Sequence, residues 1–137
     1  MAHITVLRDE AIAALPVERV GTIVDCTYGN GGHSTALLAA MPAESRLVSL
    51  DVDQTALDAN PAIDPRHVQV CANFRDLRHT LDTLSIDSVD GILADLGWRS
   101  EQFEESNKGF SFGADEPLLM TFGDPEAHVF TAHDVVN

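Results

Sequence analysis

A glycine-rich segment at residues 25–33 (DCTYGNGGH) is the part of the sequence that most clearly predicts chemistry. It lies between a short apolar run at 22–26 and an apolar helical pattern at 33–41. Glycines tolerate positive φ and let the backbone approach a ligand closely, and a helix start offers free N–H groups to polar or anionic atoms. Because no Lys-Ser/Thr pair follows, the segment is not a P-loop. We therefore predict a small-molecule site at Gly29, Gly31, Gly32 and His33.

A carboxylate follows the next apolar run at the spacing expected for a nucleoside cofactor. Asp51 lies 22 residues after Gly29 and ends the run at 46–50. An acid at the end of the second strand of such a fold accepts hydrogen bonds from ribose hydroxyls. The alternative is that the glycine turn only links a strand to a helix and that Asp51 only caps a helix.

Two later side chains are further candidates for the same site. Asp95 ends the fourth apolar run, where its carboxylate could hold an amino group for attack or simply cap a turn. Phe74 follows the third apolar run and could stack on an adenine. Its helical spacing with Leu77, Leu81 and Leu84 favours a core residue instead.

Four strands that alternate with helices must position these residues. We expect strands at 22–26, 46–50, 67–71 and 89–96, and helices at 7–15, 33–41, 53–57 and 74–84, with Asp53 and Asn73 as N-caps. The alternation predicts a doubly wound parallel α/β sheet with right-handed crossovers. The first three strands should lie in the order 3-2-1, with the fourth beside the first.

Composition and charge limit the function further. The 137 residues are 45% hydrophobic, and the net charge of −14 argues against a stand-alone nucleic-acid binder. No apolar run approaches the roughly 20 residues of a membrane span and no leader is recognised, so we expect the cytoplasm. The histidines and cysteines show no metal spacing. Cys26 and Cys71 are expected to be reduced, buried thiols that end non-adjacent strands.

The texture of the sequence changes after Gly97. Residues 101–137 contain eight acidic residues, one lysine and five of the six phenylalanines, without clear periodicity. We expect two parts: a nucleoside-binding half-domain at 1–97, and a loop or lid at 98–137 that needs a surface to pack against.

Four motifs in order resemble the bacterial small-subunit ribosomal RNA cytosine-N4 methyltransferases: 3–10 (HITVLRDE), 24–34 (VDCTYGNGGHS), 90–97 (DGILADLG) and 108–112 (KGFSF). The resemblance implies a Rossmann-like class I S-adenosylmethionine-dependent methyltransferase sheet. It also implies small-subunit ribosomal RNA as the partner, with direct transfer of a methyl group to N4 of a cytidine that has left its stack.

The resemblance also implies a role for each matching residue. Gly31, Gly32 and His33 would line the methionine and ribose side of the cofactor, Asp51 would hold the ribose hydroxyls, Phe74 would lie against the adenine, and Asp95 with Gln102 would complete the pocket near the transferred methyl group. Asp95 would be the catalytic group nearest the N4 amine.

The sequence departs from the family pattern at two places and in length. Trp98 and Arg99 stand where the family has Val-Ser, and 117–121 read PLLMT where the family has PLDMR. Family members are about twice as long, so the sheet is expected to be truncated after its fourth strand. The uncovered strand edge predicts a homo-oligomer that uses this edge or the Phe-rich tail. Two alternatives to an active methyltransferase remain: a cofactor-binding fragment without independent catalysis, and an assembly remnant.

Overall fold

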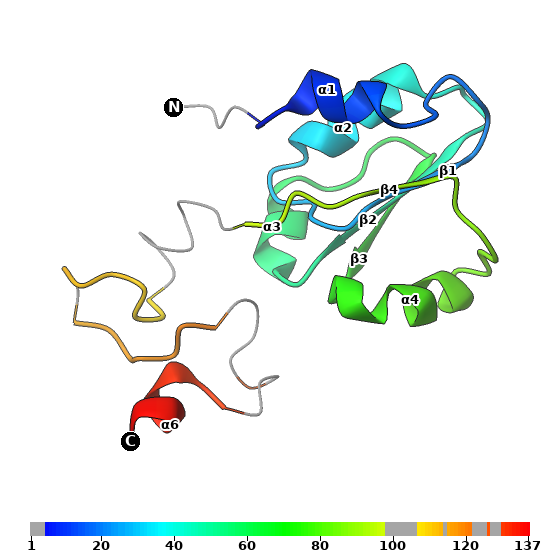
Figure 1. The fold of residues 1–137 in the computed structure, drawn as a ribbon. Helices are drawn as coiled ribbons and strands as arrows, with labels where there is room; N and C mark the ends of the chain where they lie inside the picture. The colour runs from blue at the N-terminus through cyan, green and yellow to red at the C-terminus, as the bar shows by residue number, and fades with distance from the viewer. Residues whose placement is uncertain (1–4, 98–106, 114, 122–125, 127–129) are drawn as a thin grey trace. The chain divides into compact units, whose positions relative to one another are not determined.

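A parallel sheet of four strands forms the centre of the N-terminal part of the chain (Figure 1). The strands are β1 (Thr22–Asp25), β2 (Arg46–Asp51), β3 (His67–Cys71) and β4 (Gly91–Leu93). They lie in the order β3-β2-β1-β4, and every pairing is parallel. The predicted topology, with the first three strands as 3-2-1 and the fourth beside the first, is confirmed.

The structure is a computed structural model that describes residues 5–97, 107–113, 115–121, 126 and 130–137. The chain divides into two compact units, Met1–Asp95 and Leu96–Asn137, and each is described here by itself. The N-terminal unit contains α1 (Arg8–Ala13), α2 (Gly32–Ala40), α3 (Gln54–Ala59), a 3₁₀ turn η1 (Phe74–Asp76) and α4 (Leu77–Thr83). The expected caps are present, because the side chains of Asp53 and Asn73 accept the backbone N–H of Thr55 and Arg75.

The fourth strand is much shorter than the run at 89–96 predicted. Its ladder ends where the N–H of Cys26 donates to the carbonyl of Leu93. The next donor on this side, the N–H of Asp95, bonds the side-chain hydroxyl of Thr27 at 2.8 Å instead of a strand carbonyl. The backbone therefore leaves the sheet two residues before Asp95.

Alternating side chains of the strands build a core on each face of the sheet. One face packs Ile23 and Leu47 against Leu37 of α2 and Ile12 of α1. The other packs residues of β1 and β2 against α4, and its buried members are Val24, Cys26, Val48, Leu50, Leu81 and Ile86. Helices α1 and α2 thus lie on one face of the sheet and α4 lies on the other (Figure 1).

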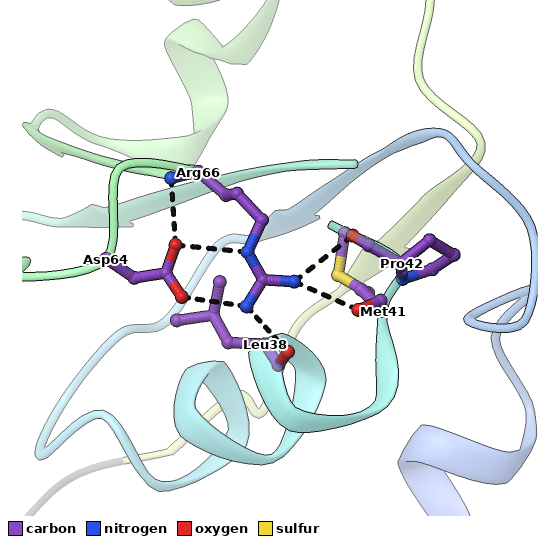
Figure 2. A network of polar contacts seen from close by, with 5 residues as sticks. All are labelled: Leu38, Met41, Pro42, Asp64 and Arg66. Carbon is purple, nitrogen blue, oxygen red and sulfur yellow. Dashed lines mark hydrogen bonds and ion pairs between the residues drawn. The ribbon is translucent and has the colours of Figure 1, made fainter. Parts of the chain in front are cut away.

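An arginine holds the C-terminal end of α2 (Figure 2). The Arg66 guanidinium donates to the carbonyls of Leu38, Met41 and Pro42 at 2.9–3.1 Å. Its other side is paired with Asp64, whose carboxylate accepts from Nε and Nη2. These hydrogen bonds from Arg66 lower the pKa of Asp64 to about 2. Helix carbonyls that lack an intrahelical partner are thereby satisfied by a fixed cation.

The two cysteines are free, as expected, but only one is buried. Cys26 follows β1 inside the core, and burial raises the pKa of its thiol. Cys71 is exposed, which corrects the expectation that both thiols are buried. It is the last residue of β3, which is an edge strand of the described sheet.

The C-terminal unit contains a short helix that the sequence interpretation missed. Helix α6 (Ala132–Val136) begins at a capping box formed by Thr131 and Asp134. Within this unit the N–H of His133 donates to the carbonyl of Leu118 at 2.8 Å. The spacing of Thr131 and Asp134 is the sequence signal that would have indicated the helix start. The lid role of the tail stays a prediction.

The residues that the structure describes offer neither a candidate membrane-spanning helix nor a candidate metal site. No helix among them is long and apolar enough to cross a membrane. Among the same residues there is no group of three or more His, Cys, Asp or Glu side chains that could hold a metal ion.

Candidate functional site

The glycine-rich turn follows β1 and is held by the neighbouring strand β2. The N–H of Tyr28 donates to the carbonyl of Leu50 at 2.9 Å, and the N–H of Gly31 closes the turn on the Tyr28 carbonyl at 2.8 Å. Gly29 and Gly31 have φ values of 54° and 75°. These conformations are unfavourable for residues with a side chain, so the glycines at these two positions are required by the backbone itself.

Close packing explains the third glycine of the turn. A Cβ atom at Gly32 would lie 1.8 Å from the hydroxyl oxygen of Thr5. At Gly31 it would lie 2.6 Å from the hydroxyl oxygen of Tyr28, which itself donates to the carbonyl of Asn60. The turn is therefore packed closely against the side chains of Tyr28 and Thr5.

Asp51, at the end of β2, is bonded directly to the turn. Its Oδ2 accepts the N–H of Gly29 at 2.8 Å, and its Oδ1 accepts the N–H of Asp53 at 3.0 Å. A carboxylate oxygen can accept more than one hydrogen bond, so both oxygens keep capacity for a ligand hydroxyl. Asp51 thus supports the backbone ahead of α3, whose N-cap is Asp53, and lies beside the glycine turn, while its contact with a ribose stays a prediction.

A histidine and a carboxylate lie together at the carboxyl ends of β1 and β4. His33, in the first turn of α2, is buried, and its Nδ1 lies 4.0 Å from Oδ2 of Asp95. The side chain of Asp95 is 51% exposed. The backbone of Asp95 is fixed by Thr27, the residue that precedes the turn. Asp95 is thus a half-exposed carboxylate beside a buried imidazole, and its backbone N–H is bonded to Thr27.

Phe74 is not a core residue. It is 45% exposed and begins the 3₁₀ turn η1, ahead of α4. The tighter 3₁₀ turn takes Phe74 out of the helical register that would place it with Leu77 and Leu81. The core interpretation, which the spacing favoured, is therefore wrong. Contact of its ring with an adenine stays a prediction.

Three residues named from the sequence lie outside the described residues. These are Gln102, predicted at the cofactor pocket, and Trp98 and Arg99, at which the sequence departs from the family pattern. The described candidates, Gly29, Gly31, Gly32, His33, Asp51, Phe74 and Asp95, all follow the carboxyl ends of the strands. In doubly wound sheets this is the edge where ligands bind.

Sequence reasoning assigned no role to a buried polar cluster directly beneath the turn. Asp25 is fully buried, and its carboxylate accepts the hydroxyl of Ser34 at 2.7 Å. Ser34 contacts Ser49, which contacts His67. Burial raises the pKa of Asp25 and lowers that of His67. A carboxylate at the end of an otherwise apolar strand was the signal that could have indicated this cluster.

Comparisons of the sequence with known proteins identify its relatives. A model of the MraW methylase family matches residues 1–137. The chain is 41% identical over 98% of its length to ribosomal RNA small subunit methyltransferase H of Lactiplantibacillus plantarum, and covers 44% of that protein. It is 44% identical over 96% of its length to the protein of the same name from Thiobacillus denitrificans, and covers 42% of it. The chain thus spans less than half the length of these curated relatives.

Proposed function

The chain belongs to the MraW methylase family, and we propose that it binds S-adenosylmethionine at the carboxyl edge of its sheet and serves the methylation of small-subunit ribosomal RNA. Methyltransferases of this family depend on S-adenosylmethionine. The Rossmann-like sheet is the cofactor-binding architecture that the sequence predicted.

The hydrogen bond from Gly29 to Asp51 is the observation that carries the proposal. It joins the turn after β1 to the acid at the end of β2 at 2.8 Å. A nucleoside cofactor needs these two elements side by side, because its ribose binds the acid while its remaining part passes over the turn. Had they been far apart, no single ligand could contact both.

The described residues fit the groups of the cofactor. The remaining acceptor capacity of Asp51 suits two ribose hydroxyls. The nine-residue helix α2 begins directly after Gly31, and the N–H groups of a first helical turn are donors that suit a polar ligand. The partly exposed ring of Phe74 offers a face for the adenine. When bound, the cofactor supplies an electrophilic methyl group.

The finer assignment is transfer to N4 of a cytidine, with Asp95 nearest the amine. In such a transfer a bond would form between N4 and the methyl carbon as the carbon–sulfur bond of the cofactor broke with its electron pair, and one N4 proton would pass to solvent. The exposed carboxylate of Asp95 accepts a hydrogen bond from the amine and aligns its lone pair. The hydrogen bond from the backbone N–H of Asp95 to the hydroxyl of Thr27 helps to hold this acceptor in place.

RNA binding requires more than the residues of this chain. Its net charge of −14 opposes a polyanion, and the curated relatives are more than twice as long. The charge favours a second candidate function, a cofactor-binding part without independent catalysis. We also infer that a second copy of the chain covers the edge of β4, because uncovered strand edges tend to pair. We further infer that the protein acts in the cytoplasm, because its proposed substrate is ribosomal RNA.

Calorimetric titration with S-adenosylmethionine tests the proposal. The Asp51→Asn variant should bind the cofactor about tenfold more weakly, because it loses the charged acceptor. Asp58→Asn is the matched control, since this exposed carboxylate only accepts from Gln54 within α3. An Asp51→Asn variant with unchanged affinity would refute the assignment. A methyl-transfer assay on unmodified small subunits, with Asp95→Ala as control, then separates catalysis from binding alone.

A further inference from the structure

Four polar side chains form a continuous hydrogen-bonded chain on the face of the sheet that α2 covers. Ser34 Oγ donates to Asp25 Oδ2 at 2.7 Å, and lies 2.7 Å from Ser49 Oγ. Ser49 Oγ in turn lies 2.8 Å from Nε2 of His67. The chain, which we call the relay, runs from the end of β1 through α2 and β2 to the edge strand β3. Asp25, Ser34 and Ser49 are buried in an otherwise apolar layer.

The number of protons on the serine hydroxyls determines which group donates in each hydrogen bond of the relay. Each serine hydroxyl has a single proton to donate. Because Ser34 donates to Asp25, Ser49 must donate to Ser34. Ser49 then has no proton left for His67, so Nε2 of His67 must carry the proton and donate. The charge on Asp25 therefore dictates the tautomer of a histidine three hydrogen bonds away.

Several groups act on the two ends of the relay. At Asp25 burial raises the pKa, while the hydrogen bonds from Ser34 and Thr27 and the nearby His33 lower it, and Asp51 raises it. At His67 burial lowers the pKa and Asp64 raises it. The ring of His67 also lies beside that of Tyr28, with centroids 5.8 Å apart. If Asp25 took up a proton on Oδ2, it would donate to Ser34 and every hydrogen bond would reverse.

The same carboxylate clamps both sides of the glycine turn. Oδ1 of Asp25 accepts the N–H of Thr27, which precedes the turn, at 3.2 Å. Oδ2 accepts the hydroxyl of Ser34, which follows it in α2. The six residues between Thr27 and Ser34, which form the turn and the helix start and include His33, are thus tied at both ends to one buried carboxylate.

We propose that Asp25 fixes the direction of this relay, and that Asp25, Ser34, Ser49 and His67 are positioning residues that hold the turn and the start of α2 for cofactor binding. The inference rests on the proposed function for its role in binding. The direction of the relay does not depend on the cofactor, because it follows from the contacts within the chain and from the ionised state of Asp25.

Nitrogen-15 NMR of the histidine rings tests the direction in the full 137-residue chain without cofactor. At pH 8 His67 should carry its proton on Nε2. In Asp25→Asn the amide oxygen stays on Thr27 and the amide N–H₂ faces Ser34, so the relay reverses and the proton of His67 moves to Nδ1. His79, on α4, is the internal control, and Asp58→Asn is the control variant. The same His67 tautomer in the wild type and in Asp25→Asn would overturn the proposal.

A pair of variants at His67 tests positioning. The amide of His67→Gln can donate where Nε2 does, whereas His67→Leu cannot. S-adenosylmethionine affinity should stay within about twofold of wild type in His67→Gln and fall about fivefold in His67→Leu. Equal affinities in the two variants would overturn the positioning role. If the wild type itself binds no cofactor, the proposed function fails, and the tautomer measurement still decides the direction of the relay.

Discussion

The two ends of α2 are both held by polar groups, but in opposite ways. At the C-terminal end, the guanidinium of Arg66 donates to three carbonyls and is paired with Asp64 at a partly exposed site. At the N-terminal end, a fully buried Asp25 accepts from Ser34 beneath the glycine turn. A partly exposed ion pair of this kind has a small desolvation cost. A buried carboxylate, in contrast, lowers the stability of the fold unless its hydrogen bonds compensate for the lost hydration.

The difference indicates what each end is for. The Arg66 cluster lies far along α2 from the turn and satisfies carbonyls that any helix end leaves open. The Asp25 cluster places a buried carboxylate next to the turn that the proposed cofactor contacts, where it accepts from Thr27 and Ser34. Such groups are retained at functional sites at the expense of stability.

The largest expected effect concerns the middle of α2, where packing and not polar contact holds the helix. Leu37 is fully buried against Ile23 and Leu47. Leu37→Ala should lower the free energy of unfolding by about 3 kcal/mol, because it removes apolar contact and leaves a cavity. Urea denaturation measures it. A loss under about 1 kcal/mol would mean that the polar ends, and not the centre, fix the helix on the sheet.

A smaller loss of stability, with a larger loss of binding, is expected at the N-terminal end. Gly31→Ala forces a side chain into a φ of 75° and against the hydroxyl of Tyr28. Gly31→Ala should lower the free energy of unfolding by about 1–2 kcal/mol and should lower the affinity for S-adenosylmethionine more than tenfold. Gly113→Ala is the control, since a Cβ there meets Ser111 at an ordinary 3.6 Å. Full cofactor affinity in Gly31→Ala would remove the turn from the site.

The smallest effect is a pH dependence of opposite sign at the two ends. The pKa of Asp64 falls from 3.8 to about 2, so its contribution is present above pH 4 and is lost as the pH falls toward 2. The pKa of Asp25 is raised by burial, so its ionised form costs stability above its folded pKa, and protonation relieves that cost.

Matched variants separate the two ends. Asp64→Asn should lower stability at neutral pH and flatten its loss in acid. Asp25→Asn should raise stability at neutral pH or leave it unchanged, and it should lower the affinity for the cofactor. Urea midpoints measured between pH 2 and pH 8 read both effects. A loss of neutral-pH stability in Asp25→Asn as large as that in Asp64→Asn would mean that both ends serve stability alone.

The sequence predicted the strand order and the position of the candidate residues at one edge of the sheet, because both follow from local patterns. The apolar runs at 22–26 and 46–50 predict strands, and parallel strands bring their carboxyl ends to one edge. The role of Phe74 as a core residue was misjudged because helical spacing does not distinguish an α-helix from a preceding 3₁₀ turn.

Contacts between distant segments were beyond a pattern-based interpretation. His67 and Ser49 are 18 residues apart, and Thr27 and Asp95 are 68 apart. Neither pair has a spacing that a helix or a hairpin would impose, so their meeting depends on the register of the sheet. The early end of β4 and the exposure of Cys71 have the same origin, since both depend on where neighbouring strands stop.

The most direct test of the site is a titration of the ¹⁵N-labelled chain with S-adenosylmethionine, followed by amide NMR. The account predicts that the amides of Gly29, Gly31, Gly32 and Asp53 shift together and saturate at one cofactor concentration, while those of Arg66 and α4 stay in place. Shifts confined to residues away from the turn and Asp51, or no saturable shift at millimolar cofactor, would contradict it.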